Sequence, residues 1–185
     1  TDFTLPVCAL FSGAVVAAIQ QGGLRDKVAL FLRLMRRENA KLQAEIDQAG
    51  AVARVFLPQN PPAWPGVAIG AFHKSLWSAS GDWYAFEQSA DGRFRHFILC
   101  DISGHGMQAA IIVSTCKTVL NLMRREKPAI FDGQSFVETY ARLLNMTLFQ
   151  NGQNQHLTTL TGFTLDSATG ELWHLSCGHP PPVLV

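Results

Sequence analysis

The sequence "SGDWY" at residues 80–84, together with "FILCDISGHG" at residues 97–106, decides the fold of this chain. Asp82 and Asp101 each stand where an apolar, strand-like run meets a glycine-containing turn. A carboxylate at a strand end can hold a hard cation, and the N–H groups of a glycine loop that opens a helix favour a phosphate. Turn aspartates that cap their neighbours give the same pattern. Spacing alone therefore leaves a metal-and-phosphate site and a pair of structural turns both open.

The apolar periodicity around these stretches predicts an α+β fold. Strands are expected at Val67–Lys74, Asp82–Gln88, Arg93–Ile102, His156–Asp166 and Glu171–Cys177, and helices at Gly106–Arg125 and Phe136–Phe149. A further strand begins at Val183–Val185. Strands, then two helices, then strands again are typical of an α+β fold with antiparallel sheets.

Residues 24–57 predict one long helix that precedes this domain. Its seam positions alternate steps of four and three, and all of them except Asn39 are apolar: Val28, Leu32, Met35, Asn39, Leu42, Ile46, Ala49 and Ala53. This heptad seam predicts a parallel two-stranded coiled coil, and hence a homodimer through residues 24–57. A single amphipathic helix packed on its own domain would show the same pattern. The proline-rich stretch 58–65 ends the helix and opens a domain that covers residues 58–185.

Residues 1–23 form a separate apolar segment. Residues 3–19 are slightly short of the roughly 20 that cross a bilayer, and basic residues such as Arg25 and Lys27 follow, as expected on the cytoplasmic side of a membrane. Three interpretations stay open: the end of a transmembrane helix, the tail of a sensory domain, and a buried soluble helix. Because the chain begins on Thr1 and ends within an apolar run, we expect it to be a piece of a longer protein.

The composition narrows the class of protein further. Of the 185 residues, 48% are hydrophobic and 16% are charged, which indicates a folded chain and not a disordered one. The net charge of +1 gives no general surface for nucleic acid, so no nucleic-acid partner is expected. The four cysteines form no CxxC pair, which favours reduced core thiols over disulfides or zinc ligands.

Three sequence blocks in this chain resemble the metal-dependent protein phosphatase (PPM) family, in its bacterial sporulation and stress-response branch. The blocks are "SGDWY", "DISGHGMQAA" and "LSCGHPPPVLV", in the family's order and at similar spacings. The resemblance covers about Ala51 to Val185. It implies an antiparallel β-sandwich flanked by helices, incomplete at its C-terminal end and preceded by the long signalling helix.

The same resemblance implies an activity and a cellular setting. A member of this branch hydrolyses phosphoserine or phosphothreonine in a partner-switching pathway that regulates sigma factors, and its substrate is a phosphorylated anti-sigma-factor antagonist. The catalytic domain would be cytoplasmic, with an upstream membrane anchor as one option. The alternative is a non-catalytic, phosphatase-like adaptor that binds a regulatory protein.

The candidate metal ligands are found partly by excluding the acidic residues that lie elsewhere in the predicted elements. Among the 14 acidic residues, only Asp82 and Asp101 lie at strand–loop junctions with glycine neighbours. The resemblance implies that these two carboxylates, with the backbone carbonyl of Ile102, bind a pair of Mn²⁺ or Mg²⁺ ions. Two such ions, about 4 Å apart, lower the pKa of a bridging water and stabilise an in-line displacement at phosphorus.

The remaining site residues surround these ligands. Gly81, Gly104 and Gly106 are expected to let the backbone approach the metals. His105 either donates a proton to the leaving oxygen or holds the loop by a hydrogen bond, and His179 is expected to pack in its turn. The family adds two further aspartates from blocks after the "GHPPP" turn, and this chain stops before both. We therefore expect this piece alone to bind metal weakly.

Overall fold

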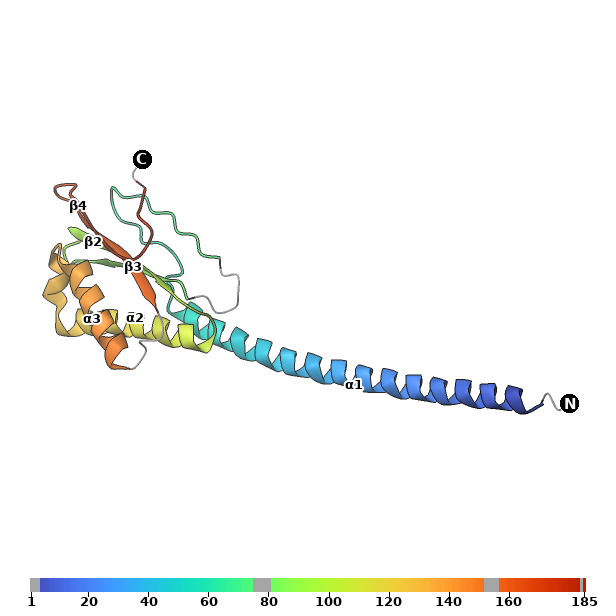
Figure 1. The fold of residues 1–185 in the computed structure, drawn as a ribbon. Helices are drawn as coiled ribbons and strands as arrows, with labels where there is room; N and C mark the ends of the chain where they lie inside the picture. Colours follow the sequence, from blue (N-terminus) through green and yellow to red (C-terminus); the bar gives the residue numbers. More distant parts are fainter. Residues whose placement is uncertain (1–3, 75–80, 152–156, 184) are drawn as a thin grey trace. The chain divides into compact units, whose positions relative to one another are not determined.

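The computed structural model describes the backbone of residues 4–74, 81–151, 157–183 and 185, and the side chains of these residues from Gly22 onward. Its elements are α1 (Thr4–Val55), β1 (Trp83–Gln88), β2 (Phe94–Ile102), α2 (Met107–Glu126), a 3₁₀ helix η1 (Pro128–Asp132), α3 (Phe136–Gln150), β3 (Thr158–Asp166) and β4 (Leu172–Cys177) (Figure 1). The chain divides into two compact units, Thr1–Ala44 and Glu45–Val185.

The second unit is built on a 4-stranded sheet with the strand order β1-β2-β3-β4. Each neighbouring pair is antiparallel, and α2 and α3 pack on one face of the sheet (Figure 1). Along β2, His96, Ile98, Cys100 and Ile102 are buried, whereas Phe97, Leu99 and Asp101 point to the opposite face. We call this opposite face the open face. The predicted α+β class with antiparallel strands is confirmed.

One predicted strand is wrong. Residues 67–74 form no strand. Within the described ranges, the β-type backbone pairing of this segment is one isolated bridge between Trp64 and Val67. Phe72 is 88% exposed. A strand exists only where a neighbour accepts and donates its backbone hydrogen bonds, and no described strand lies beside this segment. Val183 and Val185 likewise lie outside any strand.

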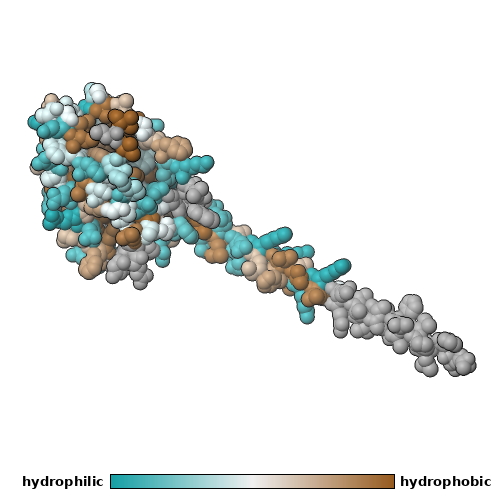
Figure 2. Space-filling view, turned by 45° about the horizontal axis from the view of Figure 1, so that its top comes forward, coloured by the Kyte–Doolittle hydropathy of each residue, from teal (hydrophilic) through white to brown (hydrophobic). Residues whose placement is uncertain are grey.

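Helix α1 confirms the long helix but divides the predicted seam. Four apolar side chains of the seam are exposed within the first unit: Val28, Leu32, Met35 and Leu42. Apolar and hydrophilic side chains alternate along this part of α1 in the space-filling view (Figure 2). Ala49 and Ala53, in contrast, are buried in the core of the second unit. The last part of the seam therefore packs on its own domain, because small alanines allow close contact, and is not available to a partner helix.

No helix is long and apolar enough to cross a membrane among the residues whose side chains are described. The segment 3–19, predicted to end a membrane or sensory module, lies outside those residues. The cysteine prediction is confirmed for Cys100 and Cys116, which are buried free thiols, whereas the free thiol of Cys177 is exposed.

A fully buried histidine joins the sheet to the helices. The Nε2 atom of His96 lies 2.9 Å from the carbonyl oxygen of Phe131, and Nδ1 lies 2.9 Å from the hydroxyl of Thr164. A carbonyl can only accept, so Nε2 carries the proton and Nδ1 accepts from Thr164. The ring stacks on Phe136 with centroids 4.1 Å apart. Burial lowers the pKa of His96 to about 4, against the opposing effects of the Phe131 carbonyl and Asp132.

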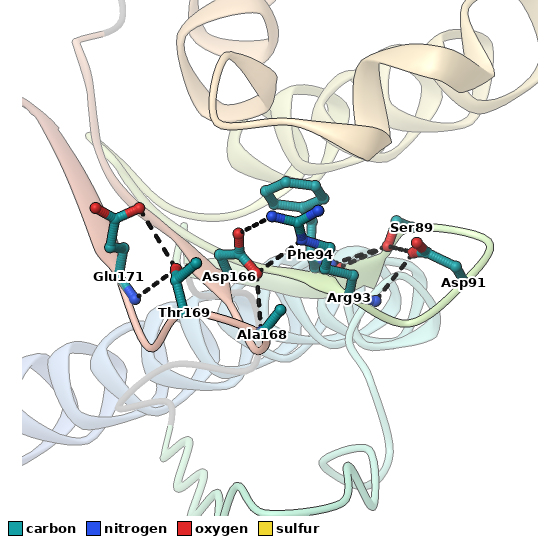
Figure 3. A network of polar contacts seen from close by, with 8 residues as sticks. All are labelled: Ser89, Asp91, Arg93, Phe94, Asp166, Ala168, Thr169 and Glu171. Atoms are coloured by element: carbon teal, nitrogen blue, oxygen red, sulfur yellow. Dashed lines mark hydrogen bonds and ion pairs between the residues drawn. The ribbon is translucent and has the colours of Figure 1, made fainter.

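Two hairpin turns are linked by a carboxylate that is almost fully buried (Figure 3). Asp166 accepts two hydrogen bonds from the guanidinium of Arg93, at 2.9 and 2.6 Å, and a third from the backbone N–H of Ala168. In the first turn, Ser89 donates to Asp91. The Arg93 guanidinium lowers the pKa of Asp166 to about 2. These contacts fix the end of the sheet that lies far from Asp82 and Asp101 in the strand register.

The depressed pKa of His96 predicts a specific pH dependence of folding stability. The unfolded chain binds a proton at this imidazole below about pH 6.5, whereas the folded chain resists protonation until about pH 4. The His96 contribution is therefore complete above pH 6.5 and is lost as the pH falls toward 4, by roughly 3 kcal/mol. Urea unfolding of the wild type and of His96→Gln at several pH values measures this. The variant should lose that part of the pH dependence, while the matched exposed-site variant His174→Gln should keep it.

Candidate metal site

Asp82 and Asp101 lie opposite each other at one end of the β1–β2 ladder. The register pairs Trp83 with Cys100, so the next antiparallel pair along the chain is Asp82 with Asp101. Side chains of directly opposite residues point to the same face of a sheet, with Cβ atoms about 5 Å apart. Cys100 is fully buried and Asp101 is exposed. Both carboxylates therefore project from the open face.

Gly81 allows the two strands to approach closely beside this pair. A Cβ atom built on Gly81 would lie 2.1 Å from the carbonyl oxygen of Ile102 and 3.0 Å from its carbonyl carbon. No side chain fits there, because backbone atoms cannot move aside as a flexible side chain can. The structure thus brings together four predicted site residues from two separate sequence blocks: Gly81, Asp82, Asp101 and Ile102.

The glycine loop connects β2 to α2 directly after these ligands. Ser103, the first residue of this loop, is held by two hydrogen bonds to Leu157. The N–H of Ser103 donates to the carbonyl of Leu157 at 2.8 Å, and the hydroxyl of Ser103 accepts from the N–H of Leu157 at 2.9 Å. Gly104 and Gly106 have φ values of 100° and 78°, a backbone region that favours glycine. Gly106 then immediately precedes the first turn of α2. The loop therefore presents a helix N-terminus next to the facing carboxylates, where an anion is favoured.

His105 and His179, the two histidines singled out in the sequence, differ in their contacts. His105 is exposed within the glycine loop, and its role as proton donor stays a prediction. His179 contacts the sheet: its Nδ1 lies 2.9 Å from the hydroxyl of Thr159, and Thr159 is the β3 partner of Asp101. The carbonyl of His179 also accepts a hydrogen bond from Ser176. These contacts give His179 a structural position beside the site.

His73 is a site neighbour that the sequence analysis did not identify. Its Nε2 lies 4.0 Å from Oδ2 of Asp82, and its side chain is 22% exposed. This nitrogen is buried without a hydrogen-bond partner among the described residues. The surrounding segment was expected to be a strand, and a lone histidine in a strand carries no pattern that would point to a site.

The donor groups at this point fit part of a divalent-metal site. Two carboxylates that face each other across a strand pair repel unless a cation lies between them. Here they adjoin a backbone carbonyl and an imidazole nitrogen that has no hydrogen-bond partner among the described residues, an oxygen-rich set that suits Mn²⁺ or Mg²⁺. Within the part of the chain that the structure describes, no three His, Cys, Asp or Glu side chains gather closely enough to hold a metal ion. Water, substrate or further protein groups would have to complete the coordination.

Comparison with known proteins finds a family model and a solved structure that are similar to this chain. A family model described as stage II sporulation protein E (SpoIIE) matches residues 91–185, a range that contains Asp101, Ile102 and the glycine loop. The crystal structure of the RsbU and RsbW domains of a Mycobacterium tuberculosis protein is similar at 27% sequence identity, with a TM-score of 0.45. That match covers 56% of this chain and 27% of the other, so the chain spans about a quarter of the length of that protein chain.

The close approach at Gly81 predicts the effect of a single methyl group. Gly81→Ala would place its Cβ against the Ile102 carbonyl, so the end of the β1–β2 ladder must open. We expect a loss of about 1–3 kcal/mol in unfolding free energy, together with loss of Mn²⁺ binding measured by calorimetry. Gly133→Ala is the matched control, because nothing lies within 4 Å of its built Cβ. Equal stability of the two variants would contradict the proposed close contact.

Proposed function

Because the chain belongs to the SpoIIE family of PPM-type phosphatases, we propose that it acts in a metal-dependent serine/threonine phosphoprotein phosphatase. The observation that carries this proposal is the facing pair Asp82 and Asp101 beside the Ile102 carbonyl. Enzymes of this family type use divalent metal ions, and this pair is the donor set that fits them. A non-catalytic adaptor would have no need of two opposed carboxylates at the start of a glycine loop.

Each residue has a defined task in the proposed reaction. When bound, the ions supply positive charge and a water of lowered pKa for in-line attack on phosphorus. The carboxylates of Asp82 and Asp101 would hold the ions in place, and the Ile102 carbonyl would add a neutral oxygen ligand. The N–H groups of the loop and of the first turn of α2 orient the phosphate. His105 donates the proton that the leaving serine or threonine oxygen needs.

The proposed substrate is a phosphorylated protein, an anti-sigma-factor antagonist in a partner-switching pathway. The family assignment supports a role in this type of bacterial signalling. The net charge of +1 is consistent with a protein partner and gives no reason to expect nucleic acid. We propose Mn²⁺ or Mg²⁺ as the ions, two of them in the complete domain.

The long helix is proposed to be the regulatory part of the protein. We propose that residues 1–23 are the end of a membrane or sensory module, that residues 24–57 are the signalling helix, and that residues 58–185 are the phosphatase domain. The exposed seam residues from Val28 to Leu42 support pairing with a second copy. A coil over this range would transmit a twist or shift from the upstream module to the catalytic domain, at the inner face of the cell membrane if the upstream module is an anchor.

Asp101→Asn tests the metal role in the complete protein. The substitution keeps the size of the side chain but removes its negative charge, so Mn²⁺-dependent hydrolysis of p-nitrophenyl phosphate should fall to background. Because Asp101 is exposed, the melting temperature should change little. The control Asp132→Asn alters an exposed carboxylate of η1 and should leave hydrolysis intact. Unchanged turnover in Asp101→Asn would refute the metal assignment, and inactivity of the unmodified protein with every divalent ion would favour the adaptor.

Charges placed on the seam test the proposed dimer. Replacing Leu32 and Leu42 by glutamate puts like charges at facing coil positions, so the variant should sediment as a monomer. Leu30 and Leu34 are similarly exposed but lie off the seam, and their replacement by glutamate should leave the dimer intact. Sedimentation of the unmodified protein as a monomer at tens of micromolar would count against the coil.

A further inference from the structure

We propose that His73 supplies a nitrogen ligand to the divalent ion held by Asp82. This inference rests on the proposed metal-dependent function and adds a ligand from outside the two motif blocks. His73 belongs to the segment between α1 and β1, which we call the connector (residues 58–74). Its Nε2 is buried, lacks a hydrogen-bond partner among the described residues, and lies 4.0 Å from Oδ2 of Asp82.

The distance between these two atoms is informative. At 4.0 Å, the separation is too long for a hydrogen bond, whose heavy atoms lie about 2.7–3.2 Å apart. It is close to twice a metal–ligand bond of roughly 2.1 Å. A buried imidazole nitrogen without a partner is unfavourable unless something fills that gap. A cation between Nε2 and Oδ2 would give the imidazole nitrogen a partner.

Phe56, just before the connector, and Pro58 and His73 within it all contact the residues that follow Asp82. The Nε1–H of Trp83 donates to the carbonyl of Phe56 at 3.0 Å, and the hydroxyl of Tyr84 donates to the carbonyl of Pro58 at 3.3 Å. The rings of His73 and Tyr84 lie side by side, with centroids 6.4 Å apart. Asp82 and the connector are therefore positioned by the same short piece of β1.

The middle of the connector is attached to the open face by a second set of contacts. The guanidinium of Arg95 donates to the carbonyl of Pro65 at 2.7 Å. Trp64 packs edge-on against Phe97 and Phe86, with centroids 5.3 and 6.3 Å apart. These contacts limit the freedom of the segment that leads to His73, so little ordering remains to be done when a metal binds.

A nitrogen ligand changes which metal the site prefers. Mg²⁺ takes oxygen ligands almost exclusively, whereas Mn²⁺ and the later transition metals accept imidazole readily. His73 should therefore raise the affinity for Mn²⁺ more than the affinity for Mg²⁺. The two aspartates and the Ile102 carbonyl alone would make no such distinction.

Pulsed electron paramagnetic resonance of the complete protein loaded with Mn²⁺ tests this directly. We expect nitrogen coupling from a bound imidazole in the unmodified protein and its loss in His73→Gln. Calorimetry should show Mn²⁺ affinity reduced at least about tenfold in His73→Gln, with a much smaller change for Mg²⁺. His174→Gln is the matched control, since His174 bonds to Thr161 outside the site and should keep the nitrogen signal.

The outcomes separate this inference from the proposed function. Mn²⁺ binding that depends on Asp101 but shows no nitrogen coupling would overturn the role of His73 and leave the phosphatase proposal standing. Nitrogen coupling that persists in His73→Gln would overturn it equally. Failure of Mn²⁺ to bind at all would overturn both. Circular dichroism of His73→Gln confirms folding, and His73→Asp, which keeps a ligand but removes the nitrogen, should bind Mn²⁺ without the signal.

Discussion

The antiparallel pairing of β1 with β2 is the constraint on which the site depends. Two sequence blocks separated by a hairpin meet because Trp83 pairs with Cys100, and one step further the same register sets Asp82 against Asp101. A shift of one residue would turn every side chain of β1 to the other face, burying Asp82 and exposing Trp83. Trp83, fully buried and stacked near Tyr140, opposes that shift by the apolar area it would lose. The core therefore fixes the position of the carboxylates.

The two faces of the sheet carry different kinds of residues: one face packs on the helices, and the other carries the carboxylates. The inner face packs His96, Ile98 and Cys100 against α2 and α3, so its side chains stabilise the domain. The open face carries aromatic residues in its middle, covered in part by Trp64 of the connector, and carboxylates at one end. The far end is fixed by Asp166 and Arg93 (Figure 3). Because the two ends are held by unrelated contacts, changes at the end that carries the carboxylates need not disturb the hairpin turns.

The sequence predicted most of the secondary structure because periodicity and turn chemistry are local. The strands around Ser89–Gly92, the helix after Gly106 and the position of Asp82 and Asp101 near strand ends all follow from short patterns. Three features could not be found in this way. Residues 67–74 have the composition of a strand but no described partner, and pairing is not a local property. Ala49 and Ala53 continue the heptad yet are buried in their own domain, which depends on tertiary contacts. His73 reaches Asp82 through the path of the connector, and no spacing in the chain encodes that distance.

The contacts of the connector also bear on how the helix and the site are joined. Ala49 and Ala53 of α1 belong to the same core cluster as Trp83 and Cys100, and these two residues flank the carboxylates in the chain. Immediately after α1, the carbonyls of Phe56 and Pro58 accept hydrogen bonds from Trp83 and Tyr84. The last turns of α1 thus share a core with β1, and the residues just after α1 accept hydrogen bonds from it. The residues that end α1 and the strand that follows Asp82 are therefore held by shared contacts.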